Sequence, residues 1–338
     1  MVPCLDDERL LDAAEGRRAL DALEEAHLGT CDECRRVFAA AARGGGGTLT
    51  STPEPAGDEP SWEELGQGVV VARRYALERF LGRGGMGIVW AARRIDDGMV
   101  VAIKIARSTD ADLHRRFERE ARIAATLVHP HVARMLDVVP ATETRGPCLV
   151  QEMLDGETLE ACLVRRGPLS LKDAARVIVP IAGALGAAHA LGIVHRDLKP
   201  QNVMLAEGRV VVLDFGIAKL LPAWGAHSRL TRTGAVLGTP RYMAPEQVFG
   251  EPDVDARADV WALGALLYRA LAGRAPIEGT TLGHVMKELG QGGVRDLATL
   301  VPGLPPDVLA LARAALVVSR ERRIASVAGF VQILEAWL

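Results

Sequence analysis

Two short polar segments near the middle of the chain constrain its fold and its chemistry more than any other feature. The first reads His195-Arg196-Asp197-Leu198-Lys199-Pro200-Gln201-Asn202, and Asp214-Phe215-Gly216 begins twelve residues after Asn202. They place a candidate base, a cation, a carboxamide and a second carboxylate on two neighbouring loops. Transfer of a phosphoryl group passes through a charged, loosely bonded state, so its catalysis depends mainly on positioning and charge neutralisation. The two segments therefore predict a site for phosphate chemistry.

The side chains of these segments suit a nucleotide phosphate with a bound cation. Mg²⁺ prefers hard oxygen ligands and keeps water and substrate phosphates in its coordination shell. Asn202 and Asp214 supply such oxygens. Asp197 can accept or orient a hydroxyl proton, and Lys199 can neutralise the charge of the moving phosphoryl group.

A glycine-rich run, Gly82-Arg83-Gly84-Gly85-Met86-Gly87-Ile88-Val89, lies upstream. Glycines let the backbone approach phosphates with no side chain in the way. A Rossmann turn or a plain hairpin can look similar, but a Rossmann turn leads into a helix. Because β-branched residues follow here, the run favours a strand-turn-strand flap.

Lys104 ends the apolar run Val101-Ala102-Ile103. Its apolar neighbours indicate partial burial, and a buried ammonium group needs partners. Glu120, on the helix expected over about 113–127, can supply the counter-charge. The alternative is that Glu120 is one of several exposed acids.

At this point the chain resembles a known family. The runs G-x-G-x-x-G-x-V, V-A-I-K, H-R-D-L-K-P-x-N, D-F-G and A-P-E (Ala244-Pro245-Glu246) form the protein-kinase signature, in order, over about residues 68–338. Within that family the chain is most similar to bacterial Hanks-type serine/threonine kinases. The resemblance implies an α+β, bilobal protein-kinase fold, with a small β-rich N-lobe (about 68–154) and a larger α-helical C-lobe (about 155–338). Short strand-like runs before Glu152 and helical patterns after Leu159 agree with it.

The resemblance also implies roles for individual residues. Lys104 holds the ATP phosphates and pairs with Glu120, Asp197 is the catalytic base, and Lys199 assists transfer. Glu246 pairs with Arg323, and Asp259 braces the catalytic loop. Magnesium, or manganese, binds Asn202 and Asp214. The expected ATP-binding residues are Leu81, Gly82, Gly84, Gly87, Val89, Ala102, Lys104, Glu152, Leu154, Met204, Asn202 and Asp214, with Gln151 as gatekeeper.

Further features of the family pattern concern the acceptor and its regulation. Lys199 and the run Gly238-Thr239-Pro240 resemble the Ser/Thr class, so protein substrates are expected. Arg196 is expected to bind a phosphate group carried by the activation loop, where Thr231 and Thr233 are the predicted autophosphorylation sites. Transfer in trans would need a transient homodimer. The alternative is that both are ordinary loop threonines.

The N-terminal region carries a second pattern. Residues 1–43 have the composition and periodicity of short helices, and residues 44–67 are typical of a flexible linker. His27, Cys31 and Cys34 form H-x₃-C-x₂-C, and Cys4 is the natural fourth ligand for tetrahedral Zn²⁺. A redox pair or unrelated thiols are the alternatives, but a thioredoxin-like motif needs a βαβ context.

This region resembles the zinc-binding anti-sigma-factor fold, so a small all-α zinc module is expected over residues 1–43. The resemblance implies a transcription-factor or regulatory partner. One alternative makes this module the main effector, with the kinase as its switch. Another alternative for the whole chain is a pseudokinase scaffold, but such proteins usually lack a residue equivalent to Lys104, Asp197 or Asp214.

Composition excludes several other classes. The 338 residues carry a net charge of −3, so no nucleic-acid partner is expected. No apolar run approaches the roughly 18–20 residues that span a bilayer, and the first residues lack a signal-peptide pattern, so the expected location is cytoplasmic.

Cys148 and Cys162 are expected to be small buried hydrophobic residues. Residues 1–67 carry a net −9 and the remainder +6, which permits either docking in cis or two independent surfaces.

Overall fold

A computed structural model describes residues 66–84, 87–106, 111–141, 146–215, 240–279, 281–291 and 293–338, together with Glu24. The chain divides into two units, Met1–Ser61 and Trp62–Leu338, and every described residue except Glu24 belongs to the second. The expected zinc ligands and phosphorylation sites lie outside the described residues: Cys4, His27, Cys31, Cys34, Thr231 and Thr233.

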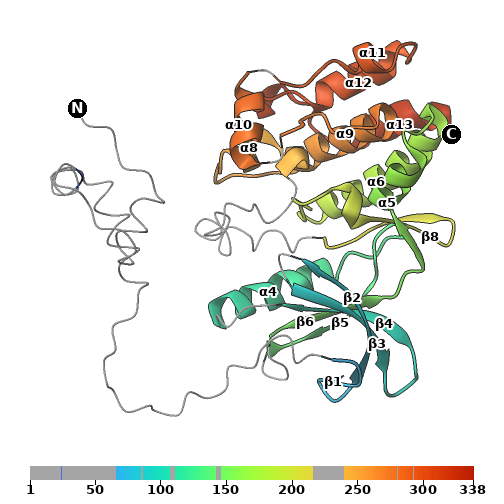
Figure 1. The fold of residues 1–338 in the computed structure, drawn as a ribbon, viewed down its shortest axis with the longest axis vertical. Coiled ribbons are helices and arrows are strands. Elements are labelled where there is room, and N and C mark those ends of the chain that lie inside the picture. Colours follow the sequence, from blue (N-terminus) through green and yellow to red (C-terminus); the bar gives the residue numbers. More distant parts are fainter. Residues whose placement is uncertain are drawn as a thin grey trace. The chain divides into compact units, whose positions relative to one another are not determined.

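The second unit begins with an antiparallel sheet in the strand order β1-β2-β3-β4-β6-β5 (Figure 1). Its strands alternate buried and more exposed side chains, as in β4, where Val101, Ile103 and Ile105 point to the core. The strands are β1 (Val70–Val71), β2 (Tyr75–Gly84), β3 (Gly87–Arg94), β4 (Val100–Ala106), β5 (Met135–Val139) and β6 (Cys148–Glu152).

One helix, α4 (Ala111–Ala124), packs on this sheet. Phe117 and Ala121, one helical turn apart, contact Ala106 and Leu149 in a small hydrophobic cluster of their own. The segment after α4 then reaches the rest of the unit, since the amide of Ala133 donates to the carbonyl of Val212 at 2.9 Å. The segment that follows α4 is therefore hydrogen-bonded to the backbone just before the loop that carries Asp214.

The remainder of the unit is mainly helical. A small sheet, β7-β8-β9, lies where this helical part meets the first sheet. The first polar segment leads into β8, and the second polar segment follows β9. Its strands are β7 (Gly156–Thr158), β8 (Val203–Ala206) and β9 (Arg209–Val212). The α-helices are α5 (Leu159–Arg166), α6 (Leu171–Ala190), α8 (Pro245–Val248), α9 (Arg257–Ala272), α10 (Leu282–Gly290), α11 (Leu297–Leu300), α12 (Pro306–Ala315) and α13 (Ala328–Leu334). Four 3₁₀ turns are η3 (Pro200–Asn202), η5 (Pro240–Tyr242), η6 (Arg320–Arg322) and η7 (Glu335–Trp337).

Local chemistry sets the ends of these helices. Thr158 caps α5, because its hydroxyl accepts from the amide of Ala161 at 3.1 Å, and Ser170 caps α6 in the same way. The C-terminal end of α9 is closed by Gly273 in the left-handed region, at φ +71°.

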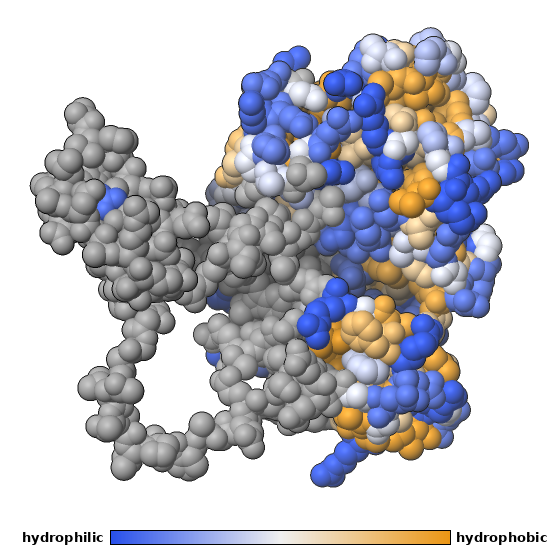
Figure 2. All heavy atoms as spheres, in the orientation of Figure 1, coloured by the Kyte–Doolittle hydropathy of each residue, from blue (hydrophilic) through white to orange (hydrophobic). Residues whose placement is uncertain are grey.

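Helix α9 is the centre of the helical lobe. It is apolar around most of its circumference, and side chains from Val260 to Leu267 are buried against α6 and α12. Buried within it is one carboxylate, Asp259, which has 0% exposure. Exposed apolar side chains are found mainly elsewhere, and the β-rich lobe shows several hydrophobic residues on its visible face (Figure 2).

The bilobal α+β architecture is confirmed, and so is the burial of Cys148 and Cys162. The expected helix at about 113–127 is α4, two to three residues earlier at each end. The sequence analysis did not predict β5, because Asp137 interrupts its apolar pattern. That side chain accepts a hydrogen bond from the buried Tyr75 hydroxyl at 2.8 Å. None of the helices in the described part of the chain is long and apolar enough to cross a membrane.

Candidate active site

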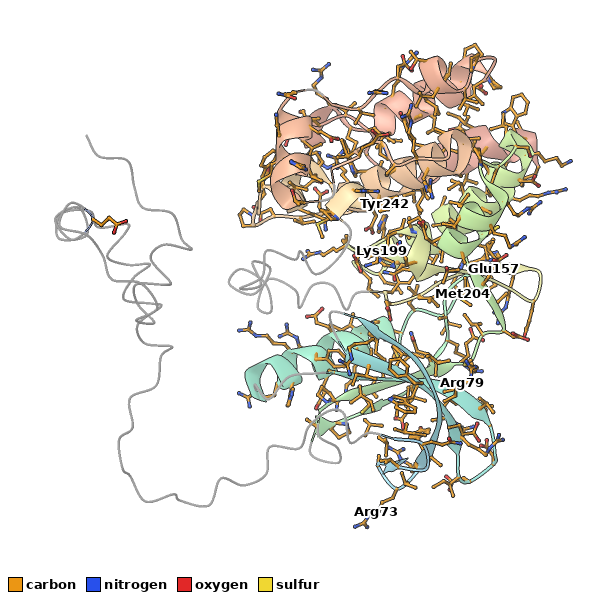
Figure 3. All side chains as sticks on the ribbon, in the orientation of Figure 1. Arg73, Arg79, Glu157, Lys199, Met204 and Tyr242 are labelled. Carbon is orange, nitrogen blue, oxygen red and sulfur yellow. The ribbon has the colours of Figure 1, made fainter. Side chains whose placement is uncertain are left out.

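A cavity of about 850 Å³ lies between the first sheet and the helical lobe. Its apolar wall includes Leu81, Val89, Ala102, Leu154 and Met204, and its polar end holds the two loops that the sequence singled out. A pocket of this size, mostly apolar with a few convergent polar groups, is typical of a small-molecule site. The molecule's side chains around this region are drawn in Figure 3, where Lys199 and Met204 are labelled.

The glycine run is a strand-turn-strand flap, as predicted, since β2 ends at Gly84 and the antiparallel β3 starts at Gly87. The two flanking glycines differ in their reason for being glycine. A Cβ on Gly82 would meet no atom within 4 Å, so this position leaves open space over the cavity. A Cβ on Gly87 would lie 2.0 Å from the carbonyl oxygen of Ile105, so only glycine permits the pairing of β3 with β4.

Lys104 projects from β4 into the cavity and forms an ion pair with Asp214, with Nζ 2.8 Å from Oδ2. Its side chain is only 13% exposed, which confirms the predicted partial burial. Burial opposes ionisation of Asp214, but the charge and hydrogen bond of Lys104 outweigh it, so the pKa of Asp214 is held below its ordinary value. Asp214 is therefore a carboxylate at neutral pH.

Glu120 lies on α4, is 7% exposed, and is paired with Arg119 of the same helix at 3.0 Å. Its burial contradicts the interpretation that it is merely one of several exposed acids. The ammonium group of Lys104 pairs with Asp214 in this structure, so the pairing of Lys104 with Glu120 stays a prediction.

The first polar segment, residues 195–202 and called the catalytic loop from here on, orients its own carboxylate. Lys199 Nζ donates to Asp197 Oδ2 at 2.7 Å, and Asn202 Nδ2 donates to the same oxygen at 3.1 Å. Asn202 also donates to the backbone carbonyl of Asp197 at 2.8 Å, which locks the loop. Both side-chain bonds go to Oδ2 of Asp197, and Asp197 is one of the residues that line the cavity.

Asp259 of α9 holds this loop from beneath. Its Oδ2 accepts from the amide of His195 at 2.8 Å and from His189 Nε2 at 2.8 Å, and its Oδ1 accepts from the amide of Arg196 at 2.9 Å. The predicted bracing role is confirmed, and His189, on α6, is a third donor that the sequence analysis did not include.

Two residues of the polar loops have unusual backbone geometry. Arg196 and Asp214 are non-glycine residues in the left-handed region, at φ +64° and +58°. Each costs on the order of 1 kcal/mol or more. Surrounding hydrogen bonds hold them: Asp259 accepts from the Arg196 amide, and the amide of Leu213, just before Asp214, donates to the carbonyl of Asn202 at 2.9 Å.

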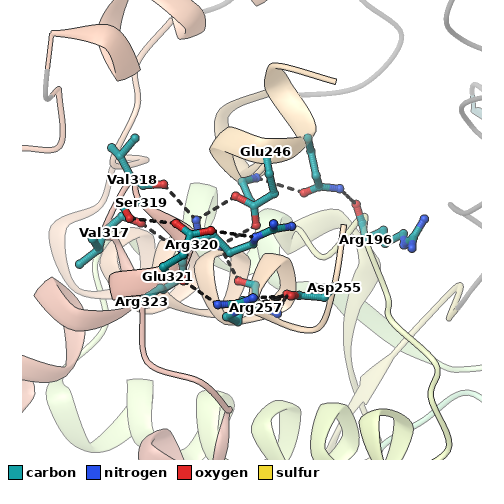
Figure 4. Close-up of polar contacts among 12 residues, drawn as sticks. Arg196, Glu246, Asp255, Arg257, Val317, Val318, Ser319, Arg320, Glu321 and Arg323 are labelled. Carbon is teal, nitrogen blue, oxygen red and sulfur yellow. Dashed lines mark hydrogen bonds and ion pairs between the residues drawn. The ribbon is translucent and has the colours of Figure 1, made fainter. Parts of the chain in front are cut away.

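The predicted Glu246–Arg323 pair is confirmed. It is bidentate, at 2.7 and 2.9 Å, and neither side chain is more than 1% exposed (Figure 4). The Arg323 guanidinium also donates to the carbonyl of Arg257 at 2.7 Å and lies 5.3 Å from the ring centroid of Trp261. In the same network, Gln247 Nε2 donates to the carbonyl of Arg196 at 2.7 Å, which connects α8 to the catalytic loop.

The structure brings most predicted site residues to one place. The cavity is lined by Asp197, Lys199, Leu81, Gly82, Gly87, Val89, Ala102, Lys104, Glu152, Leu154, Met204, Asn202 and Asp214, together with the gatekeeper Gln151. Gly84 ends β2 beside them, whereas Glu120 and Arg196 are not among the lining residues. Their roles in binding and catalysis remain predictions.

Some lining residues were missed by sequence reasoning. Thr158, Gln201 and Met243 face the cavity. Gln201 lies inside the first polar segment and could have been found there. Met243 comes from a different part of the chain, and only the fold brings it next to the catalytic loop.

The two-lobed fold with this cavity defines the class of protein kinases. The family model described as protein kinase domain matches residues 75–331, and the chain belongs to this family.

Similar sequences and a similar solved structure are also protein kinases. Serine/threonine-protein kinase PknA of Mycobacterium tuberculosis is 39% identical over 258 residues, which is 74% of this chain and 58% of PknA. Serine/threonine-protein kinase PkaA of Streptomyces coelicolor is 40% identical, over 64% of this chain and 42% of PkaA. A crystal structure of the Mycobacterium tuberculosis PknI kinase domain has a TM-score of 0.63 and 28% identity, and covers 81% of this chain and 98% of that domain. The chain thus matches about half the length of the curated relatives.

Proposed function

We propose that the chain is a serine/threonine protein kinase that transfers the γ-phosphate of ATP to hydroxyl groups of proteins. The observation that carries this proposal is the convergence of Lys104, Asp197, Asn202 and Asp214 on one cavity. A pseudokinase scaffold is disfavoured because none of these four side chains is missing or turned away from the cavity.

The residues fit the adenine nucleotide. The cavity has apolar walls for a ring, a glycine flap with open space at Gly82, and a lysine at its far end. Lys104 is the cation that meets the phosphates. Because its pair with Asp214 is a single 2.8 Å contact at a partly exposed position, a polyphosphate can share or replace that partner.

The residues also fit a divalent cation. Asn202 and Asp214 line the cavity with hard oxygen donors, and Asp214 is ionised at neutral pH. These two side chains would hold Mg²⁺ or Mn²⁺, which supplies charge neutralisation for the phosphates.

Asp197 then orients the acceptor hydroxyl and takes its proton as the new O–P bond forms, while the bond from the γ-phosphorus to the β,γ-bridging oxygen breaks and ADP leaves with that oxygen. Lys199 and Asn202 fix the carboxylate, so it presents one oxygen without rotating. Lys199 also places a positive charge beside the transferred group.

Activation by phosphorylation is part of the proposal. Within the described part of the chain, Arg196 makes one side-chain hydrogen bond, from Nη2 to the carbonyl of Val254 at 2.8 Å, and its buried Nε has no hydrogen-bond partner there. A phosphate on Thr231 or Thr233 would supply strong acceptors for it. Mass spectrometry of the purified active protein should find phosphate on these threonines, and its absence from both would contradict this step. Autophosphorylation in trans implies a transient homodimer.

We further propose that residues 1–43 form a zinc module for regulation or for docking a transcription factor. The support is the H-x₃-C-x₂-C run with Cys4. About one equivalent of zinc is expected in the full chain, with loss in a variant carrying Cys31→Ser and Cys34→Ser. Less than about half an equivalent in the unmodified chain would contradict the proposal. A pull-down of transcription factors with the full chain tests the partner.

Transfer of radiolabel from ATP tests the central proposal. The full chain is incubated with acidic and basic generic proteins, followed by phosphoamino-acid analysis. We expect label on Ser or Thr, and on the order of 100-fold less with Lys104→Ala or Asp214→Asn. The exposed Lys172→Ala and Asp307→Asn are matched controls. Equal transfer by all five proteins, or label on Tyr alone, would contradict the proposal.

A further inference from the structure

The wall of the cavity beyond the catalytic loop is formed by the segment after η5. Met243 lines the cavity together with Asp197 and Lys199, and η5 immediately precedes it. Gln247 Nε2 connects this region to the catalytic loop. A peptide that brings its hydroxyl to Asp197 therefore passes over η5. This argument rests on the proposed function.

Arg241, in η5, forms no ion pair with a carboxylate among the described residues. Its Nε donates to the carbonyl of Gly279 at 3.2 Å. It is partly exposed, so its remaining donors can reach solvent or a substrate. A backbone carbonyl fixes the guanidinium without neutralising it.

A second arginine lies near Arg241. Arg269 of α9 donates to the carbonyl of Gly273 and forms an ion pair with Glu160 at 3.7 Å, and Asp197 is already paired with Lys199. Both arginines act on Tyr242: burial raises the pKa of its hydroxyl to about 12, Glu160 adds to this, and Arg269 and Arg241 oppose it. These arginines therefore flank the same buried side chain.

The sequence around η5 has no acid to offset these cations. Between Asp214 and Glu246 there is no Asp or Glu, whereas Lys219, Arg229, Arg232 and Arg241 are present. The first three lie outside the described residues. Gln201, which lines the same cavity as Asp197, is neutral, and its buried Oε1 has no hydrogen-bond partner among the residues that the structure describes.

We propose that the acceptor groove selects acidic sequences, and that Arg241 binds an Asp or Glu side chain of the protein substrate close to the phosphorylated hydroxyl. A guanidinium held on one side by a carbonyl presents its free edge to a carboxylate, which is the acceptor it matches best. The contact is partly solvated, so it changes selectivity several-fold rather than by orders of magnitude.

A positional peptide library tests this inference. Each peptide has one Ser or Thr acceptor, and one other position at a time is fixed as Glu, Ala or Arg. With the full chain, we expect Glu at one or more positions to raise kcat/KM about fivefold over Ala, and Arg to lower it. Equal values for Glu and Arg at every position, or a preference for Arg, would overturn the inference.

The ratio of kcat/KM for the Glu and Ala peptides then assigns the selection to Arg241. It should fall to about one with Arg241→Gln and below one with Arg241→Glu. Arg313→Gln, at an exposed arginine on α12, is the matched control and should keep the wild-type ratio. An unchanged ratio in both Arg241 variants would refute the role of this residue. Transfer to no peptide or protein would instead refute the proposed function, and with it this inference, whereas transfer without acidic selection refutes the inference alone.

Discussion

Replacing Asp259 by Asn tests whether one buried carboxylate sets the catalytic loop. The carboxylate accepts from the amides of His195 and Arg196 and from His189 Nε2, all within 2.9 Å. An asparagine offers one acceptor oxygen, and in either orientation its NH₂ group faces at least one of the two backbone amides. The substitution therefore removes one bond and weakens the others.

The magnitude follows from these contacts. A buried donor left without an acceptor costs about 1–3 kcal/mol, and loss of the charge weakens the two remaining bonds. We expect the free energy of unfolding to fall by about 2–4 kcal/mol. Arg196, which is at φ +64°, would relax and shift Asp197. A misplacement of about 1 Å in an active site costs on the order of 100-fold in rate.

Denaturant unfolding of the full chain gives the free energy of unfolding. The value of kcat/KM is measured under conditions in which both the wild-type and the Asp259→Asn proteins are folded. Asp296→Asn is the control, because this exposed carboxylate pairs with Arg313 on the surface and caps α11 by accepting from the amide of Ala298 at 3.0 Å, a capping role that asparagine keeps. Less than about 1 kcal/mol is expected. An Asp259→Asn protein within about 0.5 kcal/mol of wild type and with full kcat/KM would refute the reasoning.

Three further predictions concern stability. Arg323→Ala leaves a buried carboxylate unpaired and should cost about 3–5 kcal/mol by denaturant unfolding, and a loss below about 1 kcal/mol would contradict the pairing energetics. Burial and Asp137 raise the pKa of Tyr75 to about 12. The unfolded phenol ionises near 10, so stability is fully present below that pH and is lost toward 12. Denaturation midpoints should therefore fall more steeply with pH in wild type than in Tyr75→Phe, and equal slopes would count against it. Gly87→Ala should lower the free energy of unfolding by at least about 1–3 kcal/mol through overpacking, whereas Gly82→Ala should fold normally. Denaturant unfolding measures both.

Much of the fold and of the site was predictable because the relevant residues sit in short, ordered runs. Apolar residues at a period of 3.6 predicted the long helices, and the polar loops were visible as residue types at fixed spacing. The partial burial of Lys104 also followed from its apolar neighbours.

Other features depend on contacts between distant segments, which spacing does not encode. The carboxylate partner of Lys104 depends on the positions of segments that are far apart in the sequence. In this structure the partner is Asp214 rather than the expected Glu120. The sequence likewise assigns one reason to all the glycines, whereas Gly87 is required by the neighbouring strand. The sequence analysis did not include Arg241, which only the fold places in η5, two residues before the cavity-lining Met243.

The most direct test of the account is the Asp197→Asn protein. Because Asp197 acts on the acceptor hydroxyl and not on the nucleotide, we expect affinity for ATP with magnesium to remain within a few-fold of wild type. Transfer of radiolabelled phosphate to Ser and Thr should fall by about 100- to 10,000-fold. A variant that transfers phosphate as fast as the wild-type chain would contradict the assignment of Asp197, and a wild-type chain that binds ATP but labels no protein would contradict the proposed activity itself.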